Sequence, residues 1–470
     1  MVALWQKDAF IAALNGETKG NLPDVITGIS IDSRNIEKGE AFFAIKGDVF
    51  DGHDFINQAY ANGAGVLVVS REKAELYKDI QAPLVIVDDV LEALIALGKA
   101  ARERSNAKII AVTGSVGKTT TKEALRHALT SVGKVHANPA SFNNHWGVPL
   151  TLARMPQDVD YAIFEIGMNH ENEIRPLVKM VRPHIALITL VAPVHLGHFE
   201  NIEAIANAKA EIFEGIVEGG YALLNADDQF FDYLANKAKC CGVKNICSFG
   251  EDKKADYRLI SVNLQPDCSC LSMAIGKEEA LVKVGAPGRH VVQNILAVIG
   301  AADLAGADIA HVVLSLGTFS AEKGRGARYQ LPIENGNFIL IDESYNANPT
   351  SMRAALELLF ATSPQKRGRR IAVLGDMLEL GNHSKKLHED LLTPIRDANV
   401  DLLYLIGQEM RALDDITEDQ TQTFWRINAK EILPLILSDI REGDVIMIKS
   451  SNSIHSSLIV NALIERYKPL

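Results

Sequence analysis

The chain has 470 residues and a formal net charge of −11 at pH 7, and 47% of its residues are hydrophobic. This length exceeds one ordinary hydrophobic core and predicts about three domains. The acidic balance argues against a nucleic-acid partner, because phosphate backbones are bound by clustered lysine and arginine side chains. The composition is that of a soluble enzyme.

The sequence contains no sign of a membrane segment or an export signal. The N-terminal residues reach Asp8 before an apolar segment develops, and no stretch approaches the roughly 20 apolar residues of a membrane helix. Five cysteines between Cys240 and Cys270 form an odd set without a C-x-x-C pair, which fits a reducing compartment better than a disulfide framework. Zinc ligation is the alternative, and small buried or half-buried thiols are the default. We expect a cytoplasmic protein without membrane insertion.

Residues 1–86 predict a small α/β domain. Short apolar runs alternate there with turn signals, as in the run 41–45, which Lys46-Gly47 follows directly. A helix-like segment near residues 91–104 comes next and leads into an apolar strand.

That strand carries the most informative motif of the chain. It enters a turn bounded by Gly114 and Gly117, which brings Lys118 and Thr119 to the start of a helix. The glycines leave no side chain between backbone N–H groups and phosphate oxygens, and the helix start adds free N–H groups. Lys118 would reach the β- and γ-phosphates and Thr119 would bind Mg²⁺. The turn is shorter than the common phosphate loop, and a Gly-rich turn with a solvated lysine is the alternative.

Residues 138–150 predict a polar loop beside this nucleotide site. The segment is rich in turn residues, ends in an apolar stretch and contains the amide pair Asn143-Asn144. Loops on a rigid scaffold often bind ligands, so we interpret this one as a binding loop. A merely solvated turn is the alternative.

Two of the apolar strands that follow end in polar side chains. Glu165 ends the strand 161–166, at the edge where open α/β sheets bind ligands. Its carboxylate is either a Mg²⁺ ligand or a helix cap, and the nearby phosphates favour the metal. His195 follows the similar run 185–191, and alone it would be a core or loop histidine. A further strand over 221–224 completes an alternation with helices that predicts a parallel sheet covered on both faces.

A Gly-rich, charged connection at 321–326 precedes a second series of strands. These are expected over 338–341, 370–374, 402–406 and 445–448, and they predict a second doubly wound domain. Residues 341–352 place a carboxylate, an aromatic ring and two amides where a strand passes into a helix. Taken separately, each could be a cap or turn residue.

Together these motifs resemble the Mur ligase family over nearly the whole chain. The branch that joins D-alanyl-D-alanine to a UDP-N-acetylmuramoyl tripeptide fits best, because Tyr-Asn-Ala-Asn-Pro-x-Ser-Met at 345–352 is specific to it. The other motifs that carry the resemblance are 31–34, 43–47, 51–53, the phosphate loop, 142–144, 165–167, 225–228, 342–344 and 374–381.

The resemblance implies three α/β domains with separate tasks. It assigns a UDP-sugar-binding domain to residues 1–86, a central P-loop domain for ATP and Mg²⁺ to 87–320, and a Rossmann-like acceptor-binding domain to 321–470. It implies an ATP-dependent amide ligase of peptidoglycan precursor synthesis, which would act through an acyl phosphate. We expect a monomer.

The resemblance also assigns roles to individual residues. The catalytic residues would be Lys118, Glu165, His195 and Lys209, the last matching a lysine that many members carry as a carbamate; an exposed helix lysine is its alternative. The metal ligands would be Thr119, Glu165 and His195. The nucleotide contacts would be Gly114, Ser115, Gly117, Lys118, Thr119, Thr120, Asn294, Arg325, Asp342 and Tyr345. Of these, Asn294 and Tyr345 resemble adenine contacts, and Arg325 and Asp342 resemble the phosphate and ribose contacts. The substrate contacts would be Ser33, Arg34, Lys46, Asn143, Asn144, Asn346 and Asn348.

Three departures from the family pattern and two rival functions remain. Val291 stands where an asparagine often occurs, and Leu190-Val191 replace an amide-bearing pair ahead of His195; a further departure is that residues 449–452 replace the usual Lys-Gly-Ser-Arg, so the resemblance assigns no secure acceptor-binding role to Lys449 or Ser450. A sister ligase that adds a single amino acid would use the same ATP apparatus. A nucleotide-dependent switch that hydrolyses ATP without ligation is a rival from another class.

Overall fold

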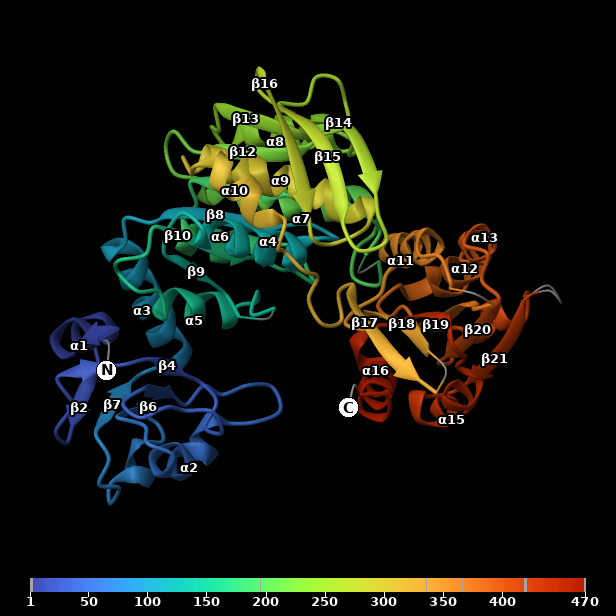
Figure 1. Ribbon diagram of the computed structural model, residues 1–470. Coiled ribbons are helices and arrows are strands. Elements are labelled where there is room, and N and C mark those ends of the chain that lie inside the picture. Colours follow the sequence, from blue (N-terminus) through green and yellow to red (C-terminus); the bar gives the residue numbers. More distant parts are fainter. Residues whose placement is uncertain are drawn as a thin grey trace.

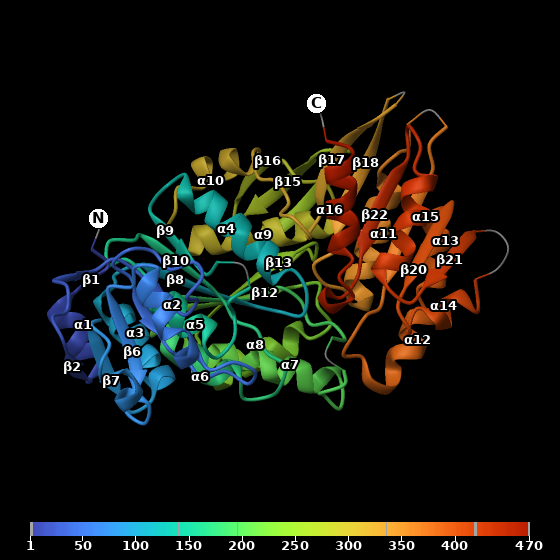
Figure 2. The ribbon, with the colours of Figure 1, turned by 90° about the horizontal axis from the view of Figure 1, so that it is seen from below.

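The structure is a computed structural model that describes residues 3–139, 141–194, 196–334, 336–365, 367–417 and 421–468. Three α/β domains follow one another along the chain, and the N- and C-terminal domains lie on opposite sides of the central one (Figures 1 and 2). The predicted fold class is therefore confirmed. Among the described residues no helix is long and apolar enough to cross a membrane.

The N-terminal domain is a five-stranded sheet with helices on both faces. Its elements are β1 (Trp5–Gln6), α1 (Lys7–Leu14), β2 (Glu17–Lys19), β3 (Val25–Ile26), β4 (Ile29–Ser30), β5 (Ala41–Phe43), η1 (Gly52–Phe55), α2 (Ile56–Ala61), β6 (Val66–Ser70), η2 (Ala74–Tyr77) and β7 (Leu84–Val87). The sheet order is β2-β7-β6-β5-β4, with only β2 antiparallel, and β1 pairs separately with β3.

Helix α3 (Val90–Arg104) joins this domain to the next and confirms the helix expected near 91–104. It shares one hydrophobic core with the N-terminal sheet and with Leu150 and Ala153 of the central domain. The Trp5 indole nitrogen donates to the Ala153 carbonyl over 2.9 Å, and the Arg104 guanidinium lies 3.5 Å from the centre of the Trp5 ring. The division between residues 86 and 87 remains a proposal, since α3 packs against both domains.

The central domain contains a nine-stranded sheet. Its elements are β8 (Lys108–Thr113), α4 (Lys118–Thr130), β9 (Val135–Ala137), α5 (Gly147–Ala153), β10 (Tyr161–Glu165), α6 (Ile174–Val181), β11 (Ile185–Ile188), α7 (Ile202–Ala210), η3 (Glu211–Gly215), β12 (Tyr221–Asn225), α8 (Phe231–Cys240), β13 (Asn245–Gly250), β14 (Tyr257–Leu264), β15 (Ser269–Ile275), β16 (Glu278–Val284), α9 (Arg289–Leu304) and α10 (Ile309–Leu316).

Six neighbouring pairings of this sheet, from β9 to β14, are parallel, as the alternation of strands and helices predicts. One apolar cluster packs α4, α9 and α10 on one face, and a second packs α5 to α8 on the other. Strands β8, β10 and β11 are almost wholly buried because both faces are covered.

The antiparallel extension β14-β15-β16 was not expected from the sequence. Its buried side chains alternate with exposed ones, as Leu271 and Met273 do on β15 and Val282 and Val284 do on β16. This period of two is the pattern of strands with one covered face, and the short turn at Gly276-Lys277 was a hairpin signal.

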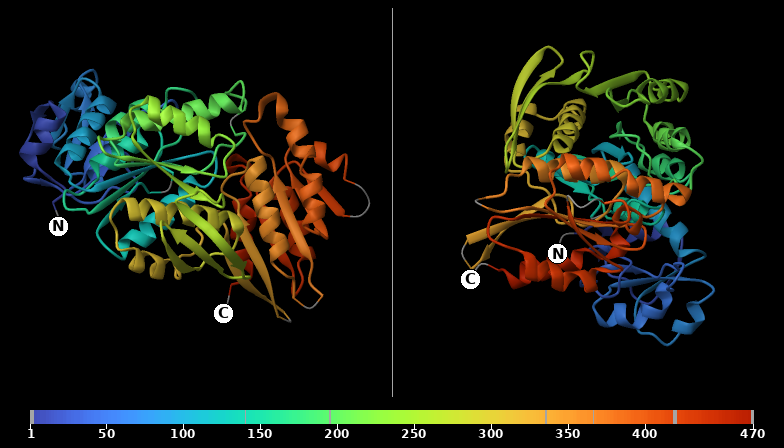
Figure 3. Two further views of the ribbon diagram at one scale, coloured as in Figure 1. Left: turned by 90° about the horizontal axis from the view of Figure 1, so that it is seen from above. Right: turned by 90° about the vertical axis from the view of Figure 1, so that its right-hand side faces the viewer.

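The C-terminal domain is a six-stranded sheet of order β17-β18-β22-β19-β20-β21, in which only β17 is antiparallel. Figure 3 shows its helices on both sides of the sheet. Its elements are β17 (Ala327–Ile333), β18 (Gly336–Glu343), α11 (Pro349–Ala361), β19 (Arg370–Gly375), η4 (Gly381–His383), α12 (Ser384–Glu389), α13 (Leu392–Asp397), β20 (Leu402–Ile406), α14 (Arg411–Asp414), β21 (Gln422–Arg426), α15 (Ala429–Asp439), β22 (Val445–Lys449), η5 (Asn452–Ile454) and α16 (Ser457–Arg466).

The order of the central strands brings the functional motifs together. Strand β8 lies between β10 and β11, so the phosphate loop, the end of β10 and the segment after β11 share one edge of the sheet. Ligands bind at this carboxyl edge in open α/β sheets. The predicted strands over 338–341, 370–374, 402–406 and 445–448 are likewise confirmed by β18, β19, β20 and β22.

Candidate active site

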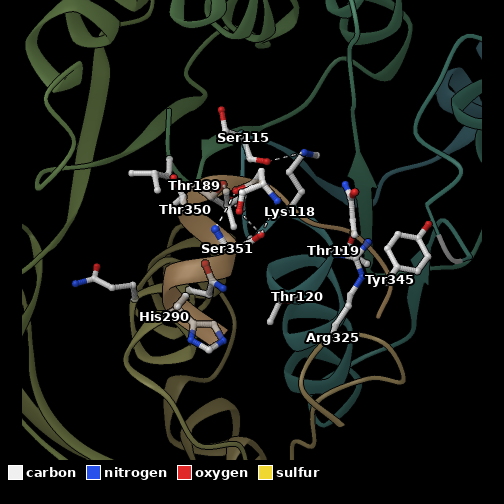
Figure 4. A pocket seen from close by; sticks show the side chains of 18 of the residues that line it. Ser115, Lys118, Thr119, Thr120, Thr189, His290, Arg325, Tyr345, Thr350 and Ser351 are labelled. Atoms are coloured by element: carbon white, nitrogen blue, oxygen red, sulfur yellow. Dashed lines mark hydrogen bonds between the residues drawn. The ribbon is translucent and has the colours of Figure 1, made fainter. Parts of the chain in front are cut away.

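A cavity of about 540 Å³ lies at this edge and extends to the C-terminal domain. Figure 4 shows side chains of both domains around it. Twelve of the predicted site residues line it: Ser115, Gly117, Lys118, Thr119, Thr120, Asn143, Glu165, Asn294, Arg325, Tyr345, Asn346 and Asn348.

The phosphate loop has the glycines that its backbone requires. Gly117 has a φ of +87°, and a Cβ there would lie 2.5 Å from Oδ1 of Asn294. A Cβ on Gly114 would lie 1.9 Å from Oγ1 of Thr189. No side chain of the described residues caps the N-terminus of α4. Its first N–H groups therefore remain available to an anion, as a phosphate cradle requires.

The Ser115 side chain is engaged within the protein. Its hydroxyl donates to the Ala192 carbonyl and accepts from the Ala192 N–H, both over 2.9 Å, and its own N–H donates to Leu190. The side chain thus joins the phosphate loop to the segment after β11. Ser115 lines the cavity, and its contact with the nucleotide remains a prediction.

Lys118 is half-buried and points back to its own loop. Its ammonium donates to the Gly114 carbonyl over 2.7 Å. Burial lowers the pKa of Lys118; the Glu165 carboxylate opposes this shift and the Arg325 guanidinium adds to it. A phosphate in the loop would offer this ammonium a charged acceptor in place of a neutral carbonyl.

Glu165 supplies a carboxylate oxygen without a partner. Its side chain is 1% exposed, and Oε1 accepts from Nδ2 of Asn143 over 2.7 Å. Oε2 is buried and accepts no hydrogen bond from the described residues. No backbone N–H of those residues donates to this carboxylate, so the structure gives the helix-cap alternative no support. A buried free carboxylate oxygen beside the phosphate loop fits a divalent cation. His195, the third predicted ligand, lies outside the described residues.

The loop that carries Asn143 is fixed by two buried residues that the sequence analysis missed. Lys122 is wholly buried on α4, is paired with Glu123, and donates to the Asn138 carbonyl over 2.9 Å. The Asn138 amide accepts from the N–H of Glu165 over 3.0 Å and donates to the Phe142 carbonyl. A lysine one helical turn after Lys118, on the face of α4 that the apolar residues share, was the available signal.

Lys209 is buried at the end of α7, so its alternative as an exposed helix lysine is wrong. It is 2% exposed, and its amine has no hydrogen bond or ion pair with the rest of the described chain. Burial lowers the pKa of Lys209 well below its usual range, and the charge of Lys118 adds to this shift. Burial thus favours the neutral form of this amine.

Arg325 and Tyr345 bring the linker and the C-terminal domain to the site. The guanidinium lies 4.1 Å from the centre of the Tyr345 ring. The Tyr345 hydroxyl donates to Oγ of Ser141 over 3.0 Å, and Arg325 donates to the same oxygen over 3.4 Å. One serine of the central loop thus contacts both predicted nucleotide residues.

Asp342 does not line the cavity. It is fully buried, and its carboxylate accepts from the Gly324 N–H over 2.8 Å and from the Ser344 hydroxyl over 2.6 Å. It holds the linker against β18, and its ribose contact remains a prediction. Lys449, which the sequence left in doubt, does line the cavity and donates to Glu343 and to the Asn346 carbonyl.

Four predicted substrate residues are not among the residues that line this cavity. Ser33 is buried in the N-terminal domain and bonds Gln58, Arg34 is exposed and paired with Asp32, and Lys46 is exposed. Asn144 accepts from the Gly147 N–H at the start of α5, a turn contact. The cavity also contains polar residues that we did not predict: Asn169, Thr189, Asn225, Asp227, His290, Gln293, Glu343, Thr350, Ser351 and Lys449.

The cysteines lie outside the cavity and are free. Cys240, Cys241 and Cys270 are exposed, so the expectation of buried or half-buried thiols is wrong for these three and right for Cys247 and Cys268. No group of three or more His, Cys, Asp or Glu side chains in the described part of the chain is arranged to hold a metal.

The fold and the cavity define a three-domain α/β enzyme with a phosphate-binding loop at the junction of two domains. Family models cover each domain: "Mur ligase family, catalytic domain" matches residues 25–104, "Mur ligase middle domain" 112–302, and "Mur ligase, glutamate ligase domain" 327–452. The chain belongs to the Mur ligase family.

Named relatives match over almost their full length. The UDP-N-acetylmuramoyl-tripeptide–D-alanyl-D-alanine ligases of Rickettsia prowazekii and Escherichia coli are each 33% identical; the matches cover 97% and 96% of this chain and 99% and 96% of those proteins. A crystal structure of MurF from Acinetobacter baumannii has a TM-score of 0.84 at 32% identity over 99% of this chain and 100% of that one. MurF of Thermotoga maritima in complex with ADP has a TM-score of 0.75 at 25% identity, over 94% and 98%.

The buried amine predicts an unusual pH dependence of stability. Below the ordinary lysine pKa near 10.4 the unfolded chain protonates Lys209, whereas the folded chain does so only below its lowered pKa. Between these two pKa values the free energy of unfolding therefore falls as the pH drops, by about 1.4 kcal/mol for each pH unit. Lys209→Met should be more stable than the wild type at pH 7, and the difference should shrink towards pH 10.5.

Denaturant unfolding at several pH values, in carbonate-free buffer without nucleotide, measures this difference. Lys253→Met, at an exposed lysine, is the control and should give a difference that does not depend on pH. A pH-independent difference for Lys209→Met as well would show that the buried amine is charged in the folded state.

Proposed function

We infer that this chain is an ATP-dependent ligase that joins D-alanyl-D-alanine to a UDP-N-acetylmuramoyl tripeptide in peptidoglycan synthesis. The relatives that match it from end to end carry this name, and MurF of Thermotoga maritima was solved with ADP. The observation that carries the inference is the cavity itself. It combines a phosphate loop, a free carboxylate oxygen and side chains from a second domain.

We propose that the reaction proceeds through an acyl phosphate. The terminal carboxylate of the tripeptide attacks the γ-phosphorus of ATP, and ADP leaves. The amine of D-alanyl-D-alanine then attacks the acyl carbon, phosphate leaves, and the attacking nitrogen loses a proton. Activation is needed because a carboxylate oxygen is a poor leaving group, and water must be kept from the activated acyl group.

The residues of the cavity can meet the electrostatic demand of the first step. A carboxylate that approaches a triphosphate is repelled, so positive charge and N–H donors must offset the repulsion in a site of low dielectric constant. Lys118, Arg325 and the N-terminus of α4 supply these groups. We propose that Thr119, Glu165 and His195 would hold Mg²⁺, which would neutralise phosphate charge when bound.

We also propose how the domains share the work. Residues 1–86 would bind the UDP-sugar, 87–320 ATP, and 321–470 the acceptor, where Asn346, Asn348 and Lys449 already line the cavity. The five free cysteines support action in the reducing cytoplasm. A monomer is our expectation, which sedimentation would test.

Coupling of phosphate release to ligation tests the proposed function. ATP, the UDP-linked tripeptide and D-alanyl-D-alanine should give one phosphate per new amide, measured by phosphate assay and product mass. A single amino acid in place of the dipeptide should give no amide product. Equal phosphate release without any acceptor would contradict ligation and favour the ATP-hydrolysing switch.

The Glu165 assignment predicts a change in metal dependence. Glu165→Gln keeps the size of the side chain and the acceptor for Asn143 but removes the charge, so the Mg²⁺ concentration for half-maximal activity should rise by roughly tenfold or more. Glu171→Gln, at an exposed carboxylate in the loop after β10, is the control and should leave the Mg²⁺ dependence unchanged. An unchanged Mg²⁺ curve for Glu165→Gln would refute the metal role.

We propose that Lys209 is carbamylated in the active enzyme. The neutral amine adds CO₂ and loses one proton, which places an anion instead of a buried cation near Lys118. ¹³C-bicarbonate should give a carbamate NMR signal that is absent in Lys209→Arg, and that variant should lose roughly 10² or more in kcat, because a guanidinium cannot form this group. Full activity of Lys209→Arg would overturn the proposal.

A further inference from the structure

Gln293 of helix α9 lines the cavity and has a side-chain oxygen without a partner among the described residues. Its Nε2 donates to Oε1 of Glu251 over 2.9 Å and approaches Oδ2 of Asp227 at 3.4 Å. Its Oε1 is buried and accepts no hydrogen bond from the described residues. Gln293 and Asp227 both line the cavity. A buried acceptor of this kind is costly unless a ligand supplies a donor.

The orientation of this amide follows from its neighbours. Carboxylates only accept hydrogen bonds, so the NH₂ group of Gln293 must face Glu251 and Asp227 and the oxygen must face away from them. Glu251 is itself held by Arg289, whose guanidinium donates to both carboxylate oxygens over 2.6 Å. Asp227 is held by the backbone N–H groups of residues 251 and 252. Both carboxylates that bind the amide are therefore held by further hydrogen bonds.

The place of Gln293 fits the nucleoside end of a bound triphosphate. The adjacent residue Asn294 lies against Gly117 of the phosphate loop, so α9 runs beside the phosphates. Phe249 and Asn225 line the same cavity as Gln293 and Asp227. Asn225 is engaged internally, since its amide donates to the Thr189 carbonyl and accepts from the Asp227 N–H.

We propose that Oε1 of Gln293 accepts a hydrogen bond from the exocyclic amine of the adenine base and thereby selects ATP. Adenine carries a 6-amino donor, whereas guanine carries a 6-oxo acceptor, which would face the Gln293 oxygen with no proton between them. Val291, two residues earlier in the same helix, is buried in the core. The Gln293 amide would therefore supply the recognition of the base. This inference rests on the proposed use of ATP.

A cycle of nucleotides and variants tests the contact. Purine riboside triphosphate has hydrogen in place of the 6-amino group, so the wild-type enzyme should use it with a kcat/KM about tenfold below that for ATP. In Gln293→Met the ratio of kcat/KM for ATP to kcat/KM for the purine riboside triphosphate should fall to nearly one, because the side chain at 293 no longer carries an acceptor. A structural role alone would lower the rates with both nucleotides equally and leave the ratio unchanged, which would overturn the proposal.

A second variant, a control variant and a parallel assay complete this test. Gln293→Asn keeps the amide but shortens it by one methylene and should reduce the ratio in the same way, should the Met variant fail to fold. Gln265→Met, in an exposed turn, is the matched control and should keep the wild-type ratio. A wild-type ratio near one would overturn the proposal without any variant. Amide formation with ATP, measured in parallel, reports the proposed function separately.

Discussion

The hydrogen bond from the buried Lys122 ammonium to the Asn138 carbonyl is the contact on which the site depends. This bond joins Asn138, at the start of the loop that carries Ser141 and Asn143, to helix α4. The Asn138 amide joins the same loop to the backbone of Glu165. The loop in turn holds the Glu165 carboxylate through Asn143 and meets the C-terminal domain through Ser141. The phosphate loop, the Glu165 carboxylate and the C-terminal domain are thus all connected to this one loop. Buried polar networks of this kind hold their members rigidly only when each is satisfied.

Several charged and polar groups of the site are not compensated by the described part of the protein. Lys118 and Lys209 are both buried enough for their pKa values to fall, and the charge of Lys118 disfavours a second charge on Lys209. Glu165 and Gln293 each leave a buried oxygen without a partner in the described chain. Such groups cost free energy in the folded protein, and an anionic nucleotide, a cation and a base amine would compensate them.

The sequence could predict most of the fold because its parallel strands are buried on both faces and stand out as apolar runs. It could not predict β14 to β16, whose alternation is weaker because one face is exposed. Local motifs identified the phosphate loop and Glu165, because the residues that define each motif are adjacent in the sequence. The sequence analysis missed Lys122, Asn138 and Gln293, because their contacts are with residues that only the fold brings near. For the same reason the motif at Asp342 could not predict that its carboxylate accepts a hydrogen bond from the linker residue Gly324.

The two domain junctions differ in kind, and this difference bears on motion. The N-terminal domain shares an apolar core with α5 through α3, so separating them would expose buried hydrophobic surface. The two hydrophobic clusters of the C-terminal domain contain only its own residues among those described, and its contacts with the central domain include hydrogen bonds such as Tyr345 to Ser141 and Gly197 to Glu379. Water can replace hydrogen bonds at little net cost. We therefore expect the chain to open at the linker near Gly324, with the first two domains moving as one body.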